Sequence, residues 1–356
     1  MHDHYHPCHP LQCIIPPHMV ESIKMRGTPK LKKMCMALEK SAEKFRAARD
    51  RLAPAEAFMA APVLPEGQKP KPNREVYDAK NGTTLPGTLV RKEGGKASKD
   101  GVANDAFNGA GDTYKMYLEN YGRDSLDGQG MKMVSTVHYD EDYNNAFWNG
   151  EQMVYGDGDG IVFKPLTGSR SVIGHELSHG VVQFSGGLVY RDQSGALNES
   201  FADVFGCLTV QYKKKQTACE ADWLVGDGIL GPDIDGVALR SMKAPGSAYD
   251  DNLLGKDPQP FHMDDYVVTS SDNGGVHINS GIPNQAFYLL AQYLGDGAWE
   301  RAGHIWYDTM QAINNPMATF SDWADKTVEM AQQRYGTGST EVIMTRRAWK
   351  LVGVSI

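Results

Sequence analysis

The sequence has few cysteines and no long apolar run. Five cysteines are spread over 356 residues, and no two of them form a Cys-x-x-Cys pair. This low density argues against a disulfide scaffold, although a Cys207–Cys219 bridge stays open. No stretch reaches the roughly 20 apolar residues that cross a bilayer, so we expect no membrane partner.

An excess of positive charge is also missing. The chain has 36 Lys and Arg against 44 Asp and Glu, a net charge of −8, which argues against a nucleic-acid partner. Residues 1–73 carry 12 basic and 7 acidic side chains, a net of +5, and residues 74–356 carry 24 and 37, a net of −13. We expect these two parts to attract each other.

The first ten residues, MHDHYHPCHP, have neither the apolar core nor the cleavage site of a secretory signal peptide. We therefore expect secretion by a route without an ordinary signal peptide, with a cytoplasmic location as the alternative. The histidines and the cysteine of this stretch form either a loose metal-binding tip or a solvated tail.

Composition divides the chain into four parts. Residues 31–52 show helical apolar spacing, and residues 53–73 contain five prolines, which is typical of an accessible linker. Residues 74–160 favour strands and turns, with one helix near 105–121. Helical spacing then recurs in 171–185, 195–212, 279–294, 298–313, 319–335 and 339–351. The pattern predicts an α+β enzyme with a cleft between a β-rich and a helical lobe.

The first chemical motif is His-Glu-Leu-Ser-His at residues 175–179. Two histidines four positions apart share one face of a helix, so His175 and His179 can bind one metal ion. Glu176 is rotated by about 100° from His175, which is where a base acting on the metal's water would stand. By itself, the motif is equally compatible with a surface helix that carries two solvated histidines.

A second segment, GALNESFADVFG at 195–206, supplies carboxylates. Glu199 would complete the three protein ligands of a catalytic zinc site with one open position. Asp203, one turn later, can accept the free N–H of a ligand histidine. The alternative is a pair of surface carboxylates, which the separate His-x-x-x-His helix argues against.

A third segment, residues 270–287, places His277 after a Gly-Gly turn. Asp272 precedes that turn and could hydrogen-bond the His277 ring, which would raise its pKa. A cationic His277 facing zinc would stabilise an oxyanion. A purely structural histidine is the alternative.

These three segments resemble the thermolysin-like neutral zinc metalloproteases. The similarity also covers VHYDEDYNNAFWNGEQMVYGDGDG at 137–160, LVY at 188–190 and LRSM at 239–242, and it extends over most of 74–356. It implies a two-lobed thermolysin-like fold with the zinc site in the cleft between the lobes. The β-rich catalytic lobe would span 74–185 and end in the zinc-binding helix, and the helical lobe would span 186–356.

The resemblance also implies a role for individual residues of this zinc endopeptidase. The zinc ligands would be His175, His179 and Glu199, with Glu176 as the general base. The oxyanion would be stabilised by His277 and Tyr190, with Asp272 orienting His277 and Asp203 orienting a ligand histidine. The substrate would be held by Asn145, Ala146 and Arg240. The pocket for a hydrophobic residue after the scissile bond would include Leu239 and Val172.

The front of the chain resembles the protealysin-like subset of that family, through Ile15-Pro16-Pro17. This resemblance implies that 1–52 is a short prosegment and that 53–73 contains the processing region. We expect the prosegment to act as an intramolecular inhibitor by steric blocking. A prosegment cysteine on the zinc is conceivable, but no spacing supports it.

Calcium is where the chain departs from thermolysin itself, which holds paired calcium ions. The matching positions include Ser171, Val210 and Leu224, which supply no carboxylate, while Asp222 and Asp227 remain. We therefore expect weak calcium dependence. Beside a monomeric peptidase, two other functions stay open: a protease-like fold used only for binding, and a zinc hydrolase acting on non-peptide substrates.

Overall fold

The computed structural model describes residues 12–49 and 70–356. A six-stranded sheet has the order β1-β5-β6-β4-β2-β3. Its strands are β1 (Gln12–Cys13), β2 (Arg74–Asp78), β3 (Thr88–Lys92), β4 (Met133–Val137), β5 (Ala146–Trp148) and β6 (Met153–Tyr155). Strands β2, β4 and β6 are parallel, and the others pair in antiparallel fashion. The front segment of the chain therefore supplies one edge strand of the sheet.

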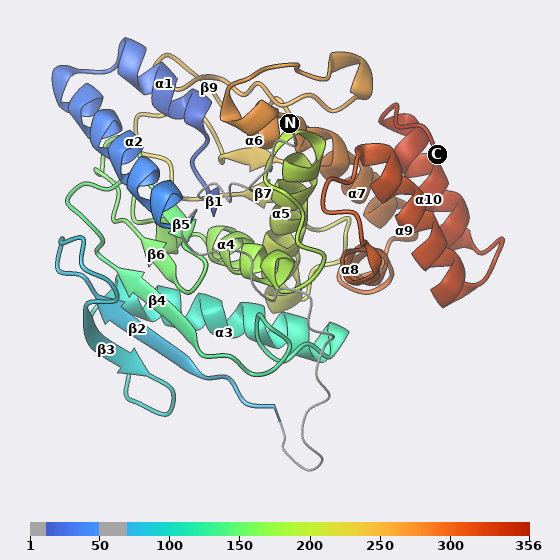
Figure 1. Cartoon of the computed structure of the whole chain (residues 1–356), viewed down its shortest axis with the longest axis horizontal. Coiled ribbons are helices and arrows are strands. Elements are labelled where there is room, and N and C mark those ends of the chain that lie inside the picture. Colours follow the sequence, from blue (N-terminus) through green and yellow to red (C-terminus); the bar gives the residue numbers. More distant parts are fainter. Residues whose placement is uncertain (1–11, 50–69) are drawn as a thin grey trace, which may run out of the picture.

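Helix α3 (Gly101–Tyr121) packs along this sheet (Figure 1). Its first turn is capped by the carboxylate of Asp100, which accepts hydrogen bonds from the backbone N–H groups of Val102 and Ala103. The helix ends at Gly122, whose left-handed conformation suits glycine. The local sequence thus fixes both ends of the helix that supports the sheet.

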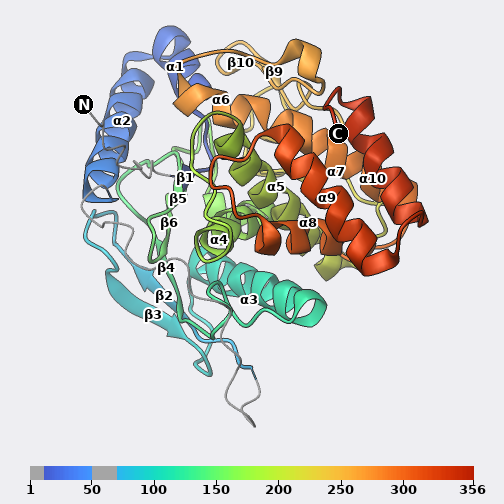
Figure 2. The ribbon, with the colours of Figure 1, turned by 45° about the vertical axis from the view of Figure 1, so that its right-hand side comes forward.

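Two buried helices, α4 (Arg170–Gln183) and α5 (Asp192–Lys214), run through the centre of the molecule (Figures 1 and 2). They approach closely because glycines face each other. A Cβ atom on Gly174 would lie 3.0 Å from the Cα atom of Gly206, and one on Gly206 would lie 2.6 Å from the Ser171 carbonyl oxygen. This close approach brings the side chains of the two motifs together.

The C-terminal part is helical, as expected, and the α+β class is confirmed. Its helices are α6 (Asp272–Asn279), α7 (Gly281–Leu294), α8 (Arg301–Ala312), α9 (Phe320–Tyr335) and α10 (Thr340–Leu351). Two small ladders pair β7 (Leu224–Val225) with β8 (Arg240–Ser241) and β9 (Asp250–Asp251) with β10 (Gly255–Lys256). Short 3₁₀ turns occupy Leu166–Gly168 and Met263–Asp265. Cys207 and Cys219 are both free thiols, so no bridge joins them.

The front segment contains more structure than its sequence predicts. Helix α2 (Pro29–Arg49) matches the expected helix, but it follows a shorter helix, α1 (Pro17–Arg26), and strand β1. Apolar side chains of this segment belong to the main hydrophobic core: Ile14, Ile15, Met19, Val20, Ile23, Leu31 and Cys35. In the described part of the chain, one ion pair joins the segment to the rest, Lys30 with Asp142 at 3.0 Å. Apolar burial therefore dominates over charge attraction in this contact.

No helix among the described residues is long and apolar enough to span a bilayer.

Candidate active site

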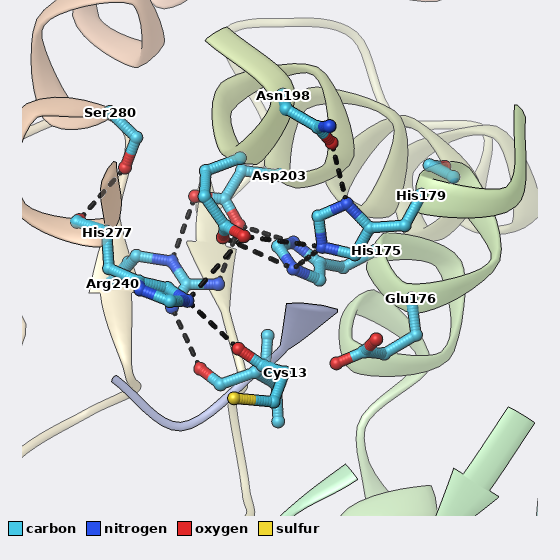
Figure 3. A network of polar contacts seen from close by, with 12 residues as sticks. Cys13, His175, Glu176, His179, Asn198, Asp203, Arg240, His277 and Ser280 are labelled. Atoms are coloured by element: carbon cyan, nitrogen blue, oxygen red, sulfur yellow. Dashed lines mark hydrogen bonds and ion pairs between the residues drawn. The ribbon is translucent and has the colours of Figure 1, made fainter. Parts of the chain in front are cut away.

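The helices α4 and α5 bring three fully buried side chains together: His175, His179 and Glu199. Figure 3 shows the two histidines side by side. The Nε2 atoms of the two histidines are 3.0 Å apart. The Glu199 carboxylate lies 3.5 Å from Nε2 of His175 and 3.4 Å from Nε2 of His179. Within residues 12–49 and 70–356, this is the group of histidine, cysteine and acidic side chains that could hold a metal ion.

The tautomers of the two histidines are fixed by the hydrogen bonds that their Nδ1 atoms make. Nδ1 of His175 faces an oxygen of Asp203 at 2.7 Å, and Nδ1 of His179 faces Oδ1 of Asn198 at 2.9 Å. Both partners are acceptors, so both Nδ1 atoms carry the proton and both Nε2 lone pairs face each other and Glu199. Burial lowers the pKa of His175 to about 4 and that of His179 to about 3, which keeps both rings neutral. This arrangement is favourable only with a cation between the rings.

Glu176 and Glu199 each have one carboxylate oxygen without a hydrogen-bond partner. Oε1 of Glu176 and Oε2 of Glu199 are buried and accept no hydrogen bond. Oε2 of Glu176 accepts one from the Trp148 backbone N–H at 3.1 Å. Burial, followed by the charge of Glu199, raises the pKa of Glu176 well above its ordinary value. The unpartnered oxygens and the His-His-Glu donor set fit a zinc ion.

Asp203 connects the metal ligands to the peptide groove. Besides His175, it accepts hydrogen bonds from Arg240 at 2.8 and 2.9 Å and from Asn284 at 2.9 Å. Burial alone would oppose its ionisation, but the charge of Arg240 and the bond from His175 lower its pKa. Asp203 therefore remains a carboxylate and can orient both partners.

His277 is held by an unusual turn at the start of α6. Residues 272–275 all have positive φ, with values of 53, 50, 88 and 77°. Two glycines make this turn possible. It folds Asp272 back onto the ring, where Oδ1 lies 2.6 Å from Nδ1 of His277. Although burial opposes the charged ring, Asp272 and then Glu199 raise the pKa of His277 to about 9.

Tyr190 lies beside this charged ring. Its hydroxyl group is 3.2 Å from Nε2 of His277 and also donates to Oε1 of Glu199. The two side chains thus present O–H and N–H groups next to the His-His-Glu cluster. Such donors can stabilise a developing oxyanion.

The front segment of the chain is bound beside the cluster by backbone hydrogen bonds. The Ile14 N–H donates to the Ala146 carbonyl at 3.2 Å, and the Ile14 carbonyl accepts from Arg240 at 3.1 Å. The Ile15 N–H donates to Oδ1 of Asn145 at 3.1 Å. The three residues expected to hold a peptide, Asn145, Ala146 and Arg240, therefore all bind the prosegment, which adds to the sheet as an antiparallel strand.

The front segment also reaches His277. The Cys13 carbonyl oxygen lies 3.0 Å from Nε2 of His277. The Cys13 sulfur instead lies 3.7 Å from the Ile15 carbonyl and falls outside the metal-ligand group. Burial, followed by the charge of Glu176, raises the pKa of this thiol to about 12. The backbone of the prosegment, rather than its thiol, therefore makes the contact with the catalytic residues.

The two remaining predicted positions, in the expected pocket for a hydrophobic residue, are buried apolar side chains. Val172 and Leu239 are fully buried and belong to the same hydrophobic cluster as Ile14. At the positions matching the calcium sites of thermolysin, Asp227 accepts hydrogen bonds from the hydroxyl groups of Ser169 and Ser171.

Sequence reasoning missed several residues that complete the site. Asn198 holds His179, Asn284 holds Asp203, and Nε2 of Gln259 donates to the His277 carbonyl at 2.8 Å. Asn198 and Asn284 lie inside the segments that carry the motifs, so an amide in an otherwise apolar helix was an available signal. For Cys13 and Ile14 the sequence offers no signal, because they act through backbone groups.

Comparison with known proteins agrees with this geometry. Residues 64–183 match the thermolysin metallopeptidase catalytic domain, and residues 186–354 match the thermolysin metallopeptidase alpha-helical domain. The chain is 48% identical over 294 residues to an extracellular metalloprotease of Pectobacterium carotovorum subsp. carotovorum, covering 82% of this chain and 83% of that one. It is 52% identical over 289 residues to protease PrtS of Photorhabdus sp. (strain Az29), covering 80% and 77%.

A solved structure is similar over nearly the whole chain. The precursor of protealysin, a metalloproteinase from Serratia proteamaculans, superimposes with a TM-score of 0.85 at 44% identity. The match covers 97% of this chain and 100% of that one. The similarity therefore includes the front segment as well as the catalytic part.

Proposed function

Because the chain belongs to the thermolysin family and is a zinc-dependent metalloendopeptidase, we propose which of its residues perform the reaction. One zinc ion would be held by His175, His179 and Glu199. The observation that carries this assignment is the pair of Nε2 atoms, 3.0 Å apart, whose lone pairs both face the Glu199 carboxylate.

Zinc bound there would polarise the substrate carbonyl and make water acidic enough to act as a nucleophile near pH 7. Glu176 takes the proton from the attacking water and passes it to the leaving nitrogen. His277 and Tyr190 donate hydrogen bonds to the oxyanion, and Asp272 keeps the His277 ring charged and oriented. Asp203 orients His175 and Arg240 through its hydrogen bonds to both side chains.

The groove would bind a substrate as an added strand on β5, as it binds the prosegment. Ala146 and Arg240 hold the residue after the scissile bond, and Asn145 holds the next N–H group. With Ile14 as the example, that first residue is hydrophobic and would lie near Val172 and Leu239. Because these residues bind both N–H and carbonyl groups of a backbone, the site favours a peptide over a non-peptide substrate.

The prosegment, residues 1–52, would inhibit the enzyme by occupying this groove until the linker, residues 53–73, is cut. The support is its contact with His277 and its hydrogen bonds to the three peptide-holding residues. The lobes would be 74–185 and 186–356, as the resemblance implies. Sequencing the N-terminus of the active species would locate the cut.

Several further features belong to the same proposal. The enzyme would act as a monomer without nucleic-acid or membrane partners, and with weaker calcium dependence than its resemblance to thermolysin implies. The name of the Pectobacterium relative supports an extracellular location. Finding the active species in cells but not in the medium would favour the cytoplasmic alternative.

The role of Glu176 is tested by Glu176→Gln. The amide has the same size but cannot accept the proton, so we expect casein hydrolysis to fall by at least about 10³-fold. The ligand set is intact, so zinc content, measured by atomic absorption, should stay at the wild-type level. Retained activity would show that Glu176 is not the general base. Loss of zinc from this variant would show that Glu176 also helps to hold the metal.

A further inference from the structure

His18 lies where the prosegment meets the catalytic body, at the start of α1. Its Nε2 atom is 2.9 Å from the hydroxyl group of Tyr249. Its Nδ1 atom is shielded from solvent and has no hydrogen-bond partner. The docked ring therefore has one partner for its two nitrogens. A second proton would place a charged N–H group where nothing accepts it.

The charged groups around His18 also disfavour a proton. Strand β8 presents Arg240, and α6 presents His277, which is itself held in the charged form. Asp272 is the carboxylate that faces His18, but it is already bonded to both the ring and the backbone N–H of His277. Burial contributes most, and the docked state lowers the pKa of His18 to about 4.

His18 is also rigidly connected to the inhibitory strand. Pro16 and Pro17 are the residues between Ile15 and His18, and their fixed φ angles leave little freedom between them. A displacement of His18 must therefore pull on Ile14 and Ile15, whose backbone groups fill the groove.

From this geometry we propose that His18 is an acid-sensitive latch, whose protonation releases the prosegment from the peptide groove. The inference rests on the proposed inhibitory role of the prosegment. After release, His18 is solvated and recovers its ordinary affinity for a proton. Neutral pH thus favours the closed precursor, and acid favours the open one.

Protonation of His18 and docking of the prosegment are thermodynamically linked, and this linkage gives the direction and size of the pH effect. A ring whose pKa is about 4 when docked and about 6.5 when released binds a proton mainly in the released state between those values. Docking is strongest above pH 6.5 and weakens as the pH falls toward 4. Between pH 7.5 and pH 5, the released population should rise about 30-fold.

Hydrogen exchange measures this population without relying on catalysis. The zinc-loaded full chain with Glu176→Gln, which prevents self-cleavage, is compared with the same chain carrying His18→Gln. The amides of Ile14 and Ile15 are bonded only in the docked state, so their exchange, corrected for the intrinsic rate, reports release. We expect a rise of about 30-fold at pH 5 in the first protein and a nearly flat profile in the second.

Two further variants complete the test. His304→Gln removes a partly buried histidine of α8 whose pKa is also lowered, and it should keep the full rise. Tyr249→Phe removes the partner of His18 but keeps the titrating ring, so it should also keep the rise. If amide exchange at Ile14 and Ile15 has the same pH dependence with and without His18, the latch is wrong, but the inhibitory role of the prosegment is not affected. If the Ile14 and Ile15 amides exchange freely at pH 7.5 in all variants, both the latch and the inhibitory role of the prosegment are wrong.

Discussion

Individual histidines of this protein differ in charge because their partners differ. His175 lies beside Asp203 and Glu199 in a buried cluster, but burial, together with the nearby charges of Arg240 and His277, lowers its pKa to about 4 and keeps it neutral. His277 faces Asp272 and Glu199, and its pKa is about 9. Burial opposes the proton in both cases, so the balance between the nearby carboxylates and the nearby positive charges decides the outcome.

His138 is the clearest case outside the active site. Its Nδ1 lies 2.7 Å from Asp157 and its Nε2 lies 2.8 Å from Asp100, the residue that caps α3. The hydrogen bond to Asp157 contributes most and, with Asp100, raises the pKa of His138 to about 9. The charged ring therefore ties the end of β4 to the start of α3.

We expect His138→Gln to destabilise the protein at pH 7 by about 1–2 kcal/mol, allowing for the partial exposure of the site. A raised pKa in the folded state stabilises fully below the unfolded value of about 6.5, and this contribution is lost as the pH rises through 9. The difference between the two proteins should therefore shrink by pH 10. Urea unfolding at both pH values measures it, and a difference that grows with pH would contradict the assignment.

At the scale of elements, the two-residue strand β1 positions the front segment at the site. Strand β1 pairs only Gln12 and Cys13 with β5, yet it brings the backbone of the next residues onto Ala146, Asn145 and Arg240. An edge strand offers unpaired backbone groups to any extended segment. The same edge can therefore hold first the prosegment and then a substrate.

Ile14→Asp tests whether this strand blocks the enzyme. Ile14 is fully buried, and an aspartate there would place an unpaired charge near Glu176. We expect the unprocessed chain to hydrolyse casein at least about tenfold faster than the wild-type precursor. Mass spectrometry must show that the chain is still intact. As a control, Met25→Asp on the exposed face of α1 should keep the precursor latent. Unchanged latency of Ile14→Asp would remove the strand from the inhibitory mechanism.

At the scale of the whole molecule, hydroxyl groups and packing stabilise the region where thermolysin holds calcium. Ser169 and Ser171 donate to Asp227 between α4 and the loop after β7, and Val210 is buried in α5. Few carboxylate oxygens are left there for a hard cation.

We therefore expect EGTA to leave both the thermal midpoint and the casein hydrolysis of the processed enzyme unchanged. A chelator of transition metals, 1,10-phenanthroline, should abolish hydrolysis, and added zinc should restore it. Differential scanning calorimetry and the casein assay follow the two effects. A fall of the thermal midpoint in EGTA, reversed by calcium, would show that a calcium site exists after all.

The sequence by itself determined the helices after residue 100 and the residue set of the metal-binding motif. The spacing of His175 and His179 is a property of one helix turn, and Glu199 with Asp203 repeats it on the next helix. These are local regularities, so they can be recognised without coordinates. The α+β class and the helical C-terminal part followed in the same way from periodicity.

Only the tertiary structure decided how the front segment meets the site. The Cys13 carbonyl and the His277 ring are 264 residues apart, and their contact uses a backbone atom that every residue possesses. The environment of His18 likewise comes from Tyr249, Arg240 and Asp272 on separate elements. Backbone recognition leaves no mark on residue identity, and the surroundings of His18 come from segments far apart in the chain, so no local pattern in the sequence could have predicted either contact.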